Sequence, residues 1–130
     1  MKNEKSCGCI IVNDEKILLV EQVNSGTYNF PKGHMNPGET EIETAIREVK
    51  EETNLDVIIN DQLRFPLSYV QKGTINKEVV YYVASITNIN DLKPQIKEIN
   101  KMLWVNIDKV YDTLTFDNLK NIWKDVLDVL

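Results

Sequence analysis

The residues of this sequence with the greatest capacity for chemistry are glutamates concentrated in one short segment. Residues 39–52 contain six glutamates against Arg47 and Lys50, a net charge of −4, whereas the whole chain of 130 residues carries −5. At about 100° per residue in a helix, four of these glutamates share one arc: Glu41, Glu48, Glu51 and Glu52. Like charges at i, i+3 and i, i+4 spacing repel one another, so a positive charge near this arc would stabilise the helix.

Two interpretations of the acidic arc are open. One is a solvated surface whose repulsion is relieved by salt. The other is a divalent-cation site, because Mg²⁺ and Mn²⁺ prefer carboxylate oxygens and need only one or two of them when substrate phosphates complete the coordination. Lys32, Gly33 and His34 lie just upstream, in a loop that leads to the predicted helix N-terminus, where anions bind. This neighbourhood favours a site at which a cation and a polyphosphate meet.

The acidic helix itself is predicted from a change of hydrophobic period. Apolar residues recur with helical spacing from position 42, and they are Ile42, Ala45, Ile46 and Val49. Thr40 is the expected N-cap, with Glu43 completing a capping box, and Asn54 is the expected left-handed stop.

The other elements must support this helix. Strands are predicted over residues 7–12, 17–20, 57–59, 63–70, 79–86 and 103–105. The first two form a hairpin across Asn13-Asp14. A second helix begins after an Asp117 N-cap and packs through Leu119, Ile122, Trp123, Val126, Leu127 and Leu130. This order predicts an α/β fold in which a mixed sheet lies between helices.

Composition narrows the class of protein. The length suits one domain over residues 1–130, and the sequence lacks both an apolar run of the ~20 residues that cross a membrane and a secretory signal. A net charge of −5 disfavours a general nucleic-acid-binding surface. Two cysteines make no disulfide framework, so a cytoplasmic location is expected. Cys7 and Cys9 alternate with Ile11, which favours one buried strand face over a metal site.

The spacing of the acidic segment resembles the Nudix box, G-x5-E-x7-R-E-U-x-E-E-x-G-U, where U is aliphatic. Read from Gly33 through Glu39 to the run Arg-Glu-Val-Lys-Glu-Glu-Thr-Asn-Leu at residues 47–55, the chain matches eight of nine defined positions. The exception is Asn54, where the box has glycine. Because asparagine tolerates a left-handed conformation, we expect the helix to stop there all the same.

The resemblance implies a Nudix-type α/β/α sandwich that hydrolyses a phosphoanhydride bond with Mg²⁺ or Mn²⁺. It implies that Glu48, Glu51 and Glu52 are catalytic, metal-binding carboxylates and that the carbonyl of Gly33 is a further ligand. Arg47 would orient a catalytic glutamate, and Glu39 would have a supporting role. A small nucleotide would be the partner, with no membrane involved, and both a monomer and a homodimer are open.

A narrower resemblance concerns segments outside the box. Residues 6–11 (Ser-Cys-Gly-Cys-Ile-Ile), residues 29–34 (Asn-Phe-Pro-Lys-Gly-His) and Glu98 ahead of Trp104 are similar to the asymmetrical diadenosine tetraphosphate hydrolases, which release ATP and AMP. The branch implies that Lys32 and His34 contact phosphates and that Glu98 is a further metal ligand or the base. The alternatives are a polar loop for His34 and an exposed loop glutamate for Glu98.

In the same branch an aromatic side chain stacks on adenine, and Tyr69 and Tyr82 are the candidates. Tyr69, Tyr81 and Tyr82 could equally be core residues, and only one of the adjacent pair can face a given side of the sheet. Phe116 is a further candidate for a base pocket, with the core as its alternative.

The box leaves the substrate open, because it handles metal and phosphate only. The same mechanism could act on a nucleoside triphosphate, a nucleotide sugar or a capped RNA 5′ end, the one nucleic-acid partner that remains open. A module that senses nucleotides without cleaving them is also possible. The presence of every box glutamate favours an enzyme.

Overall fold

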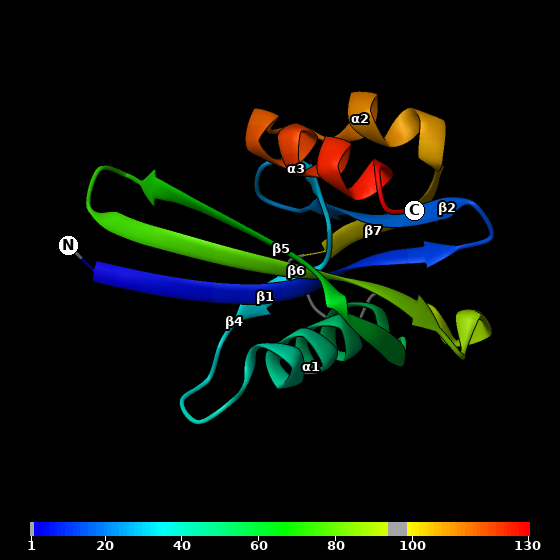
Figure 1. Cartoon of the computed structure of the whole chain (residues 1–130), viewed down its shortest axis with the longest axis horizontal. Helices are drawn as coiled ribbons and strands as arrows, with labels where there is room; N and C mark the ends of the chain where they lie inside the picture. The colour runs from blue at the N-terminus through cyan, green and yellow to red at the C-terminus, as the bar shows by residue number, and fades with distance from the viewer. Residues whose placement is uncertain (1, 94–98) are drawn as a thin grey trace.

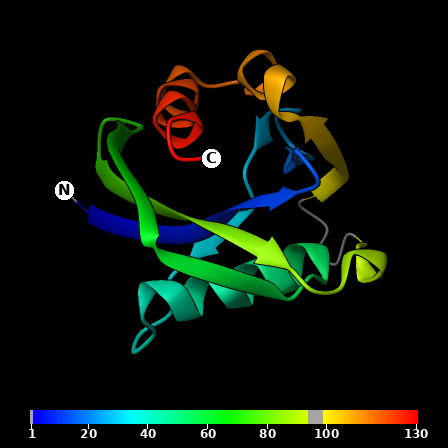
Figure 2. The same cartoon turned by 45° about the vertical axis from the view of Figure 1, so that its right-hand side comes forward.

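The computed structural model describes residues 2–93 and 99–130 of the chain. Its elements are β1 (Lys2–Asn13), β2 (Lys16–Gln22), β3 (Tyr28–Asn29), β4 (Lys32–His34), α1 (Glu41–Thr53), β5 (Val57–Gln71), β6 (Ile75–Ile86), η1 (Ile89–Asp91), β7 (Ile99–Asn106), η2 (Ile107–Lys109), α2 (Val110–Thr113) and α3 (Asp117–Leu127). Helix α1 lies on one side of the strands, and α2 and α3 lie on the other (Figures 1 and 2). The predicted sandwich is confirmed.

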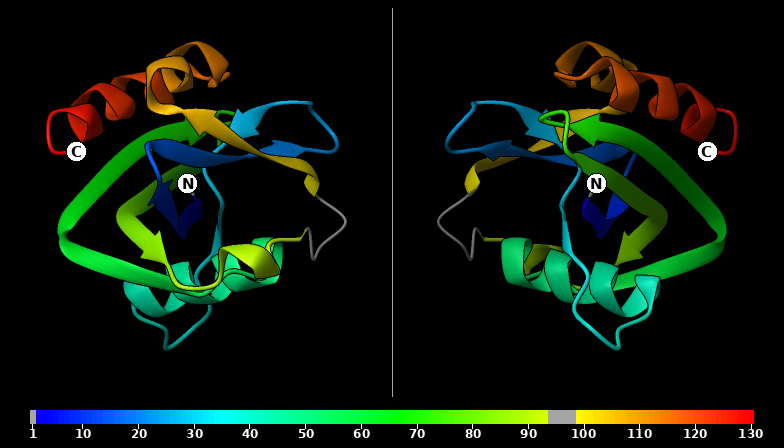
Figure 3. Two further views of the ribbon diagram at one scale, coloured as in Figure 1. Left: turned by 90° about the vertical axis from the view of Figure 1, so that its right-hand side faces the viewer. Right: turned by 90° about the vertical axis from the view of Figure 1, so that its left-hand side faces the viewer.

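The sheet is mixed, as expected, and β1 is its organising strand. The strand order is β3-β2-β1-β6-β5, with β4 added to β1 and β7 added to β2. β1 runs parallel to β6 from Lys2↔Ile75 to Ile11↔Ala84, and only its last two residues pair with β2 in the predicted hairpin. Figure 3 shows the resulting curvature, with β5 and β6 bending around the space between the helical layers.

Side chains on the two faces of the sheet form two separate cores. The core beneath α3 includes Phe30, Tyr81 and Trp123, and the ring centroids of Phe30 and Tyr81 lie 5.3 Å apart. The core over α1 contains Cys7 and Cys9. Both thiols are fully buried, which confirms that they face the protein interior from one side of a strand.

Helix α1 begins and ends where the sequence predicts. The Thr40 hydroxyl accepts a hydrogen bond from the Glu43 backbone at 3.1 Å, and the Glu43 carboxylate accepts one from the Thr40 backbone at 2.9 Å. Asn54 closes the helix in the left-handed conformation, with φ 65°.

The buried face of α1 differs from the predicted stripe. Ile46 is 42% exposed, whereas Thr44, Ala45, Val49, Glu52 and Thr53 are buried. Polar residues can occupy this face because their polar atoms find local partners: the Thr44 hydroxyl donates to Glu39 at 2.9 Å, and the Thr53 hydroxyl donates to the Val49 carbonyl at 2.7 Å. A prediction based on apolar residues alone misses these two threonines. The buried face of α1 is therefore rotated toward the acidic arc relative to the predicted stripe.

Three further expectations need correction. The strands predicted at 57–59 and 63–70 form one strand, β5, with an irregular register between Ile59 and Arg64. Asp117 is the first residue of α3 rather than its N-cap, which is Phe116 and makes no side-chain capping bond. Leu127 and Leu130 are exposed, because α3 ends at Leu127 before another turn can pack.

No helix in the described part of the chain is long and apolar enough to span a membrane.

Candidate active site

The contact between Glu48 and Gly33 joins helix α1 to strand β4. A Cβ atom built on Gly33 would overlap the carboxylate of Glu48, so the acidic group rests on the glycine backbone. Burial raises the pKa of Glu48, and the hydrogen bond from Arg47 opposes that rise. The absence of a side chain at Gly33 leaves room for this contact, which brings the box carboxylate against the strand that carries Lys32 and His34.

Arg47 is the hub of the acidic segment. Its guanidinium donates to Glu39 at 2.7 and 3.0 Å, to Glu48 at 2.9 Å and to Glu51 at 3.1 Å. A fifth bond, 2.8 Å long, reaches the backbone carbonyl of His34. The bond from Arg47 is the main reason that the pKa of Glu39 falls to about 2. The contacts to Glu48 and Glu51 are those that an orienting arginine would make.

Glu52 completes the set of box carboxylates from the buried side of the helix. It is 5% exposed, whereas about half of the Glu51 side chain is open to solvent. The charges of Glu52 and Glu48 act on Lys32, whose pKa is lowered by burial first and by Lys77 second, while the two glutamates raise it. The ammonium group of Lys32 is thus influenced both by the carboxylates of α1 and by Lys77.

The chemistry of the donor set suits a divalent cation. Hard cations take carboxylate and carbonyl oxygens, and Glu48, Glu51 and Glu52 offer them beside Gly33. The hydrogen bond from Arg47 only partly cancels the rise in the pKa of Glu48 that burial causes. A cation beside Glu48 would therefore stabilise the charged carboxylate. The described residues contain no preassembled group of three metal-ligating side chains. Glu98 lies outside the described residues.

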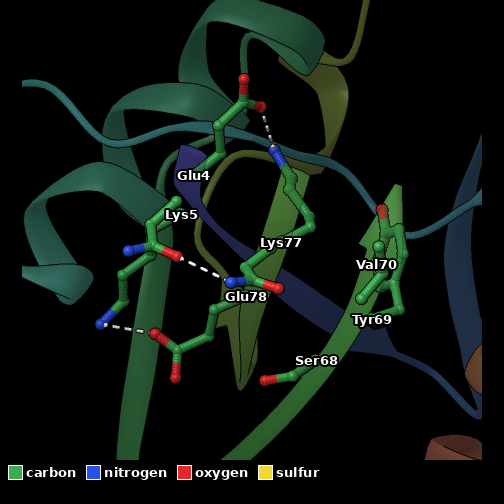
Figure 4. A pocket seen from close by; sticks show the side chains of 9 residues that line it. Glu4, Lys5, Ser68, Tyr69, Val70, Lys77 and Glu78 are labelled. Carbon is green, nitrogen blue, oxygen red and sulfur yellow. Dashed lines mark hydrogen bonds and ion pairs between the residues drawn. The ribbon is translucent and has the colours of Figure 1, made fainter. Parts of the chain in front are cut away.

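The sheet face opposite α1 carries positive charge. Strand register places Glu4, Lys77 and Tyr69 in one row, and His34 beside Ser6 in the next. The ammonium group of Lys77 lies 3.7 Å from a Glu4 oxygen and 3.5 Å from His34 Nε2. Figure 4 shows the Glu4–Lys77 pair beside Tyr69.

Burial dominates the electrostatics of this face. It lowers the pKa of Lys77, although Glu4 partly compensates, and it also lowers the pKa of His34, with the charge of Lys77 acting in the same direction. A cavity of about 340 Å³ opens on this cluster and is lined by Lys32, His34, Lys72 and Lys77 among others. An anion would relieve the charge repulsion among these groups. No local sequence pattern singles out Lys72, in the turn between β5 and β6, or Lys77, in β6.

A second cavity of about 450 Å³ adjoins the first. Its aromatic lining comes from Tyr69, Tyr81 and Phe116, and Lys32 also reaches it. Tyr69 and Phe116 are 37% and 47% exposed, so their rings can accept a planar ligand. The structure places Tyr82 on the other face, where its hydroxyl donates to Glu41 at 2.7 Å. Tyr81, which is fully buried, lies behind the cavity in place of Tyr82.

A sandwich that sets glutamates of one helix beside a cationic sheet face defines a class of phosphate-handling domain. Residues 2–125 match the NUDIX domain family, so the chain belongs to this family and is a Nudix hydrolase. Nudix hydrolases generally use divalent metal ions.

Similar proteins agree with this assignment. The asymmetrical bis(5′-nucleosyl)-tetraphosphatase of Rattus norvegicus is 28% identical over an alignment that covers 89% of this chain and 88% of the relative. The m7GpppN-mRNA hydrolase of Saccharomyces cerevisiae is 30% identical over 87% of this chain, yet the chain spans only 12% of that protein's length. A C. elegans Ap4A hydrolase binary complex has the same fold, with a TM-score of 0.86, 25% identity and coverage of 97% and 96% of the two chains. These similarities agree with the assignment of the chain to the Nudix hydrolases.

Proposed function

We propose that this protein hydrolyses dinucleoside polyphosphates with Mg²⁺ or Mn²⁺ and converts diadenosine tetraphosphate into ATP and AMP. The observation that carries the proposal is the continuity of the site: Lys32 lines two cavities, one cationic and one aromatic, and the next residue, Gly33, lies against the Glu48 carboxylate of α1. A substrate with a long polyphosphate and a base fits both cavities. Similarity to the rat tetraphosphatase over most of both chains supports this choice.

The carboxylates have the most direct role in the proposed mechanism. Glu48, Glu51 and Glu52 would hold the divalent ion together with the Gly33 carbonyl. When bound, such an ion lowers the pKa of a coordinated water and offsets phosphate charge. A carboxylate then accepts the proton of the attacking water. Either a box glutamate or Glu98 could be this base.

The cationic cavity would bind the polyphosphate. Lys77 is buried and Lys32 is half-buried, and their ammonium groups gain from an anionic partner because burial has removed part of their hydration. His34 can donate a hydrogen bond to a phosphate oxygen from the same face. These residues hold the bridge in place while its anhydride bond lies near the carboxylates, which supplies the positioning part of catalysis.

The aromatic cavity would bind one base. Tyr69 and Phe116 both line it, and stacking of a base on an aromatic ring tolerates different bases because each offers a π-face. The adenine of the AMP or ATP portion is the proposed occupant.

The test combines a substrate panel with the Glu52→Gln variant. We expect ATP and AMP from diadenosine tetraphosphate and a fall in turnover of at least ~10²-fold in the variant, the usual scale for loss of a catalytic group, with an unchanged circular dichroism spectrum. Millimolar Mg²⁺ or Mn²⁺ should raise the melting temperature, because ligands that bind only the folded state stabilise it. Unchanged turnover in the variant would remove Glu52 from the mechanism.

The panel also separates the alternatives. Capped RNA belongs in it because the yeast m7GpppN-mRNA hydrolase is 30% identical to this chain. Pyrophosphate release from a nucleoside triphosphate would indicate a different substrate class. Nucleotide binding without turnover would indicate a sensing module. The single-domain organisation, the cytoplasmic location and the oligomeric state stay predictions.

A further inference from the structure

Two asparagines connect the C-terminal end of α1 to the segment that follows β6. The Asn54 side-chain amide donates to the backbone carbonyl of Asp91 in η1 at 2.9 Å. The Asn88 side chain accepts from the Asp56 backbone at 2.8 Å and donates to the Asp91 carboxylate at 3.0 Å. A backbone bond from Lys93 to the Thr53 carbonyl, 3.0 Å long, lies beside them. The end of the helix is therefore attached to η1 by side chains as well as by backbone.

These bonds restrain the last turn of α1, which carries Glu51 and Glu52. The final carbonyl groups of a helix have no partner within the helix and allow its end to fray. Here the Lys50 carbonyl accepts from the Asn54 backbone at 3.0 Å, and the Asn54 carbonyl accepts from the Lys50 ammonium at 3.2 Å. The turn that presents two of the box carboxylates thus has its terminal groups satisfied.

Asn54 occupies a backbone position that favours glycine. Its φ of 65° lies in the left-handed region, which carries an energetic penalty for residues with a Cβ. Glycine would form the same turn with less strain. What the asparagine adds is the amide contact with Asp91, so this contact is the property that distinguishes the residue present from the simpler choice.

We propose that Asn54 is a positioning residue for the metal-binding carboxylates. By attaching the last turn of α1 to η1, it fixes the backbone of Glu51 and Glu52 before the cation arrives. Ordering of the turn is then completed during folding instead of during ion binding, and preorganisation of this kind increases affinity. Asn88 assists by holding the Asp91 carboxylate. The inference rests on the metal site proposed above.

The principal test is the Asn54→Gly variant, with affinity for Mn²⁺ alone measured by calorimetry. The variant keeps the left-handed turn and loses the amide. We expect Mn²⁺ to bind roughly 3- to 10-fold more weakly, the effect of losing about one net hydrogen bond that supports the bound arrangement. The melting temperature should change by less than about 4 °C, because relief of the left-handed strain opposes the lost bond. A purely structural role would move the melting temperature and leave the Mn²⁺ affinity unchanged.

Asp14→Gly is the matched control. Asp14 also has a positive φ, 54°, but it is exposed in the β1–β2 turn, so its replacement by glycine should leave Mn²⁺ affinity unchanged. A second variant, Asn88→Ala, leaves the sequence of α1 unchanged, loosens Asp91 and removes a 3.4 Å hydrogen bond to the Asn54 carbonyl, and it should weaken Mn²⁺ binding in the same direction as Asn54→Gly.

The outcomes separate the inference from the function beneath it. Wild-type affinity in Asn54→Gly would overturn the positioning role of Asn54, whatever the result for Asn88→Ala. An equal loss in Asp14→Gly would also overturn it, since added chain flexibility would then explain the effect. Absence of Mn²⁺ binding by the wild-type protein, even beside a non-hydrolysable nucleotide, would refute the metal site itself.

Discussion

Replacement of Gly33 by alanine should inactivate the enzyme without unfolding it. The added methyl group would overlap the Glu48 carboxylate, and non-bonded atoms cannot share that space. The obstacle is the far end of a flexible side chain, so Glu48 moves and the backbone of β4 stays. The φ of Gly33 lies outside the left-handed region, and alanine is therefore acceptable to the backbone.

The size of the effect follows from the displacement. A shift of about 1 Å in a catalytic group can reduce the rate ~10²-fold, which corresponds to about 2.7 kcal/mol of transition-state stabilisation. The stability change should be much smaller. The main contact at risk is the Arg47–Glu48 ion pair, 2.9 Å long, and partly exposed pairs contribute about 0.2–1 kcal/mol. Activity should thus fall far more than the free energy of unfolding.

The assay is kcat/KM on diadenosine tetraphosphate for four proteins: the wild type, Gly33→Ala, Glu48→Gln and the double variant. If the methyl group acts through Glu48, its effect should largely vanish once that carboxylate is gone, and the double variant should resemble Glu48→Gln. Fully additive losses would refute the reasoning, because groups in contact are expected to couple. Full activity of Gly33→Ala would refute it more simply.

Three other predictions test separate parts of the structure. Phe116→Ala should raise KM with little change in kcat, because base stacking contributes about 1–3 kcal/mol; steady-state kinetics check this, and an unchanged KM contradicts it. Arg64 first, then other partners, holds the pKa of Glu41 far below its ordinary value, so this stabilisation is present above pH 4.5 and is lost as pH falls. Lowering the pH from about 7 to about 3 should therefore reduce the free energy of unfolding, measured with urea, more for the wild type than for Glu41→Gln. Equal reductions in the two proteins would contradict this prediction. Burial raises the pKa of Cys7 to about 11 and that of Cys9 to about 12, so both thiols should resist iodoacetamide until denaturant is added. Mass spectrometry measures the adducts, and rapid labelling of the native protein would contradict the burial.

Local patterns predicted the elements whose signals are local. Thr40 and Glu43 form their capping box, and β1 and β2 form the predicted hairpin, although its turn consists of Asp14 and Glu15, one residue later than predicted. The N-terminal extension of β1 was missed because Lys2, Asn3, Glu4 and Lys5 are polar on both faces. These residues form a strand because they pair with β6, distant in sequence, and such pairing leaves no periodic signal in the segment itself.

The candidate site divides in the same way. Glu48, Glu51 and Glu52 lie on one helix, so their spacing alone was enough to group them. Lys77 could not be found in this manner, because its neighbours Glu4 and His34 come from other strands and reach it only through the register of the sheet.

Local sequence pattern could not decide which of Tyr81 and Tyr82 faces the cavity side of the sheet. Val79 and Val80 precede them, and residues 79–84 are all buried. A strand that is apolar on both faces has no alternation to assign its sides. Register with β1 and β5 decides the matter.

Arg47 explains how α1 can carry its carboxylates without a cation. A guanidinium has five N–H donors, and all five are used, on Glu39, Glu48, Glu51 and the His34 carbonyl. Glu48 and Glu51 each accept from Arg47 through one oxygen, Oε1, so the second oxygen of each carboxylate can turn toward a cation. Glu39 holds two of these bonds and anchors the guanidinium, whereas Glu48 and Glu51 hold one each and can leave at the smaller expense. The bonding pattern therefore divides the acidic segment into one structural carboxylate and two that are free to change partners when a divalent ion binds.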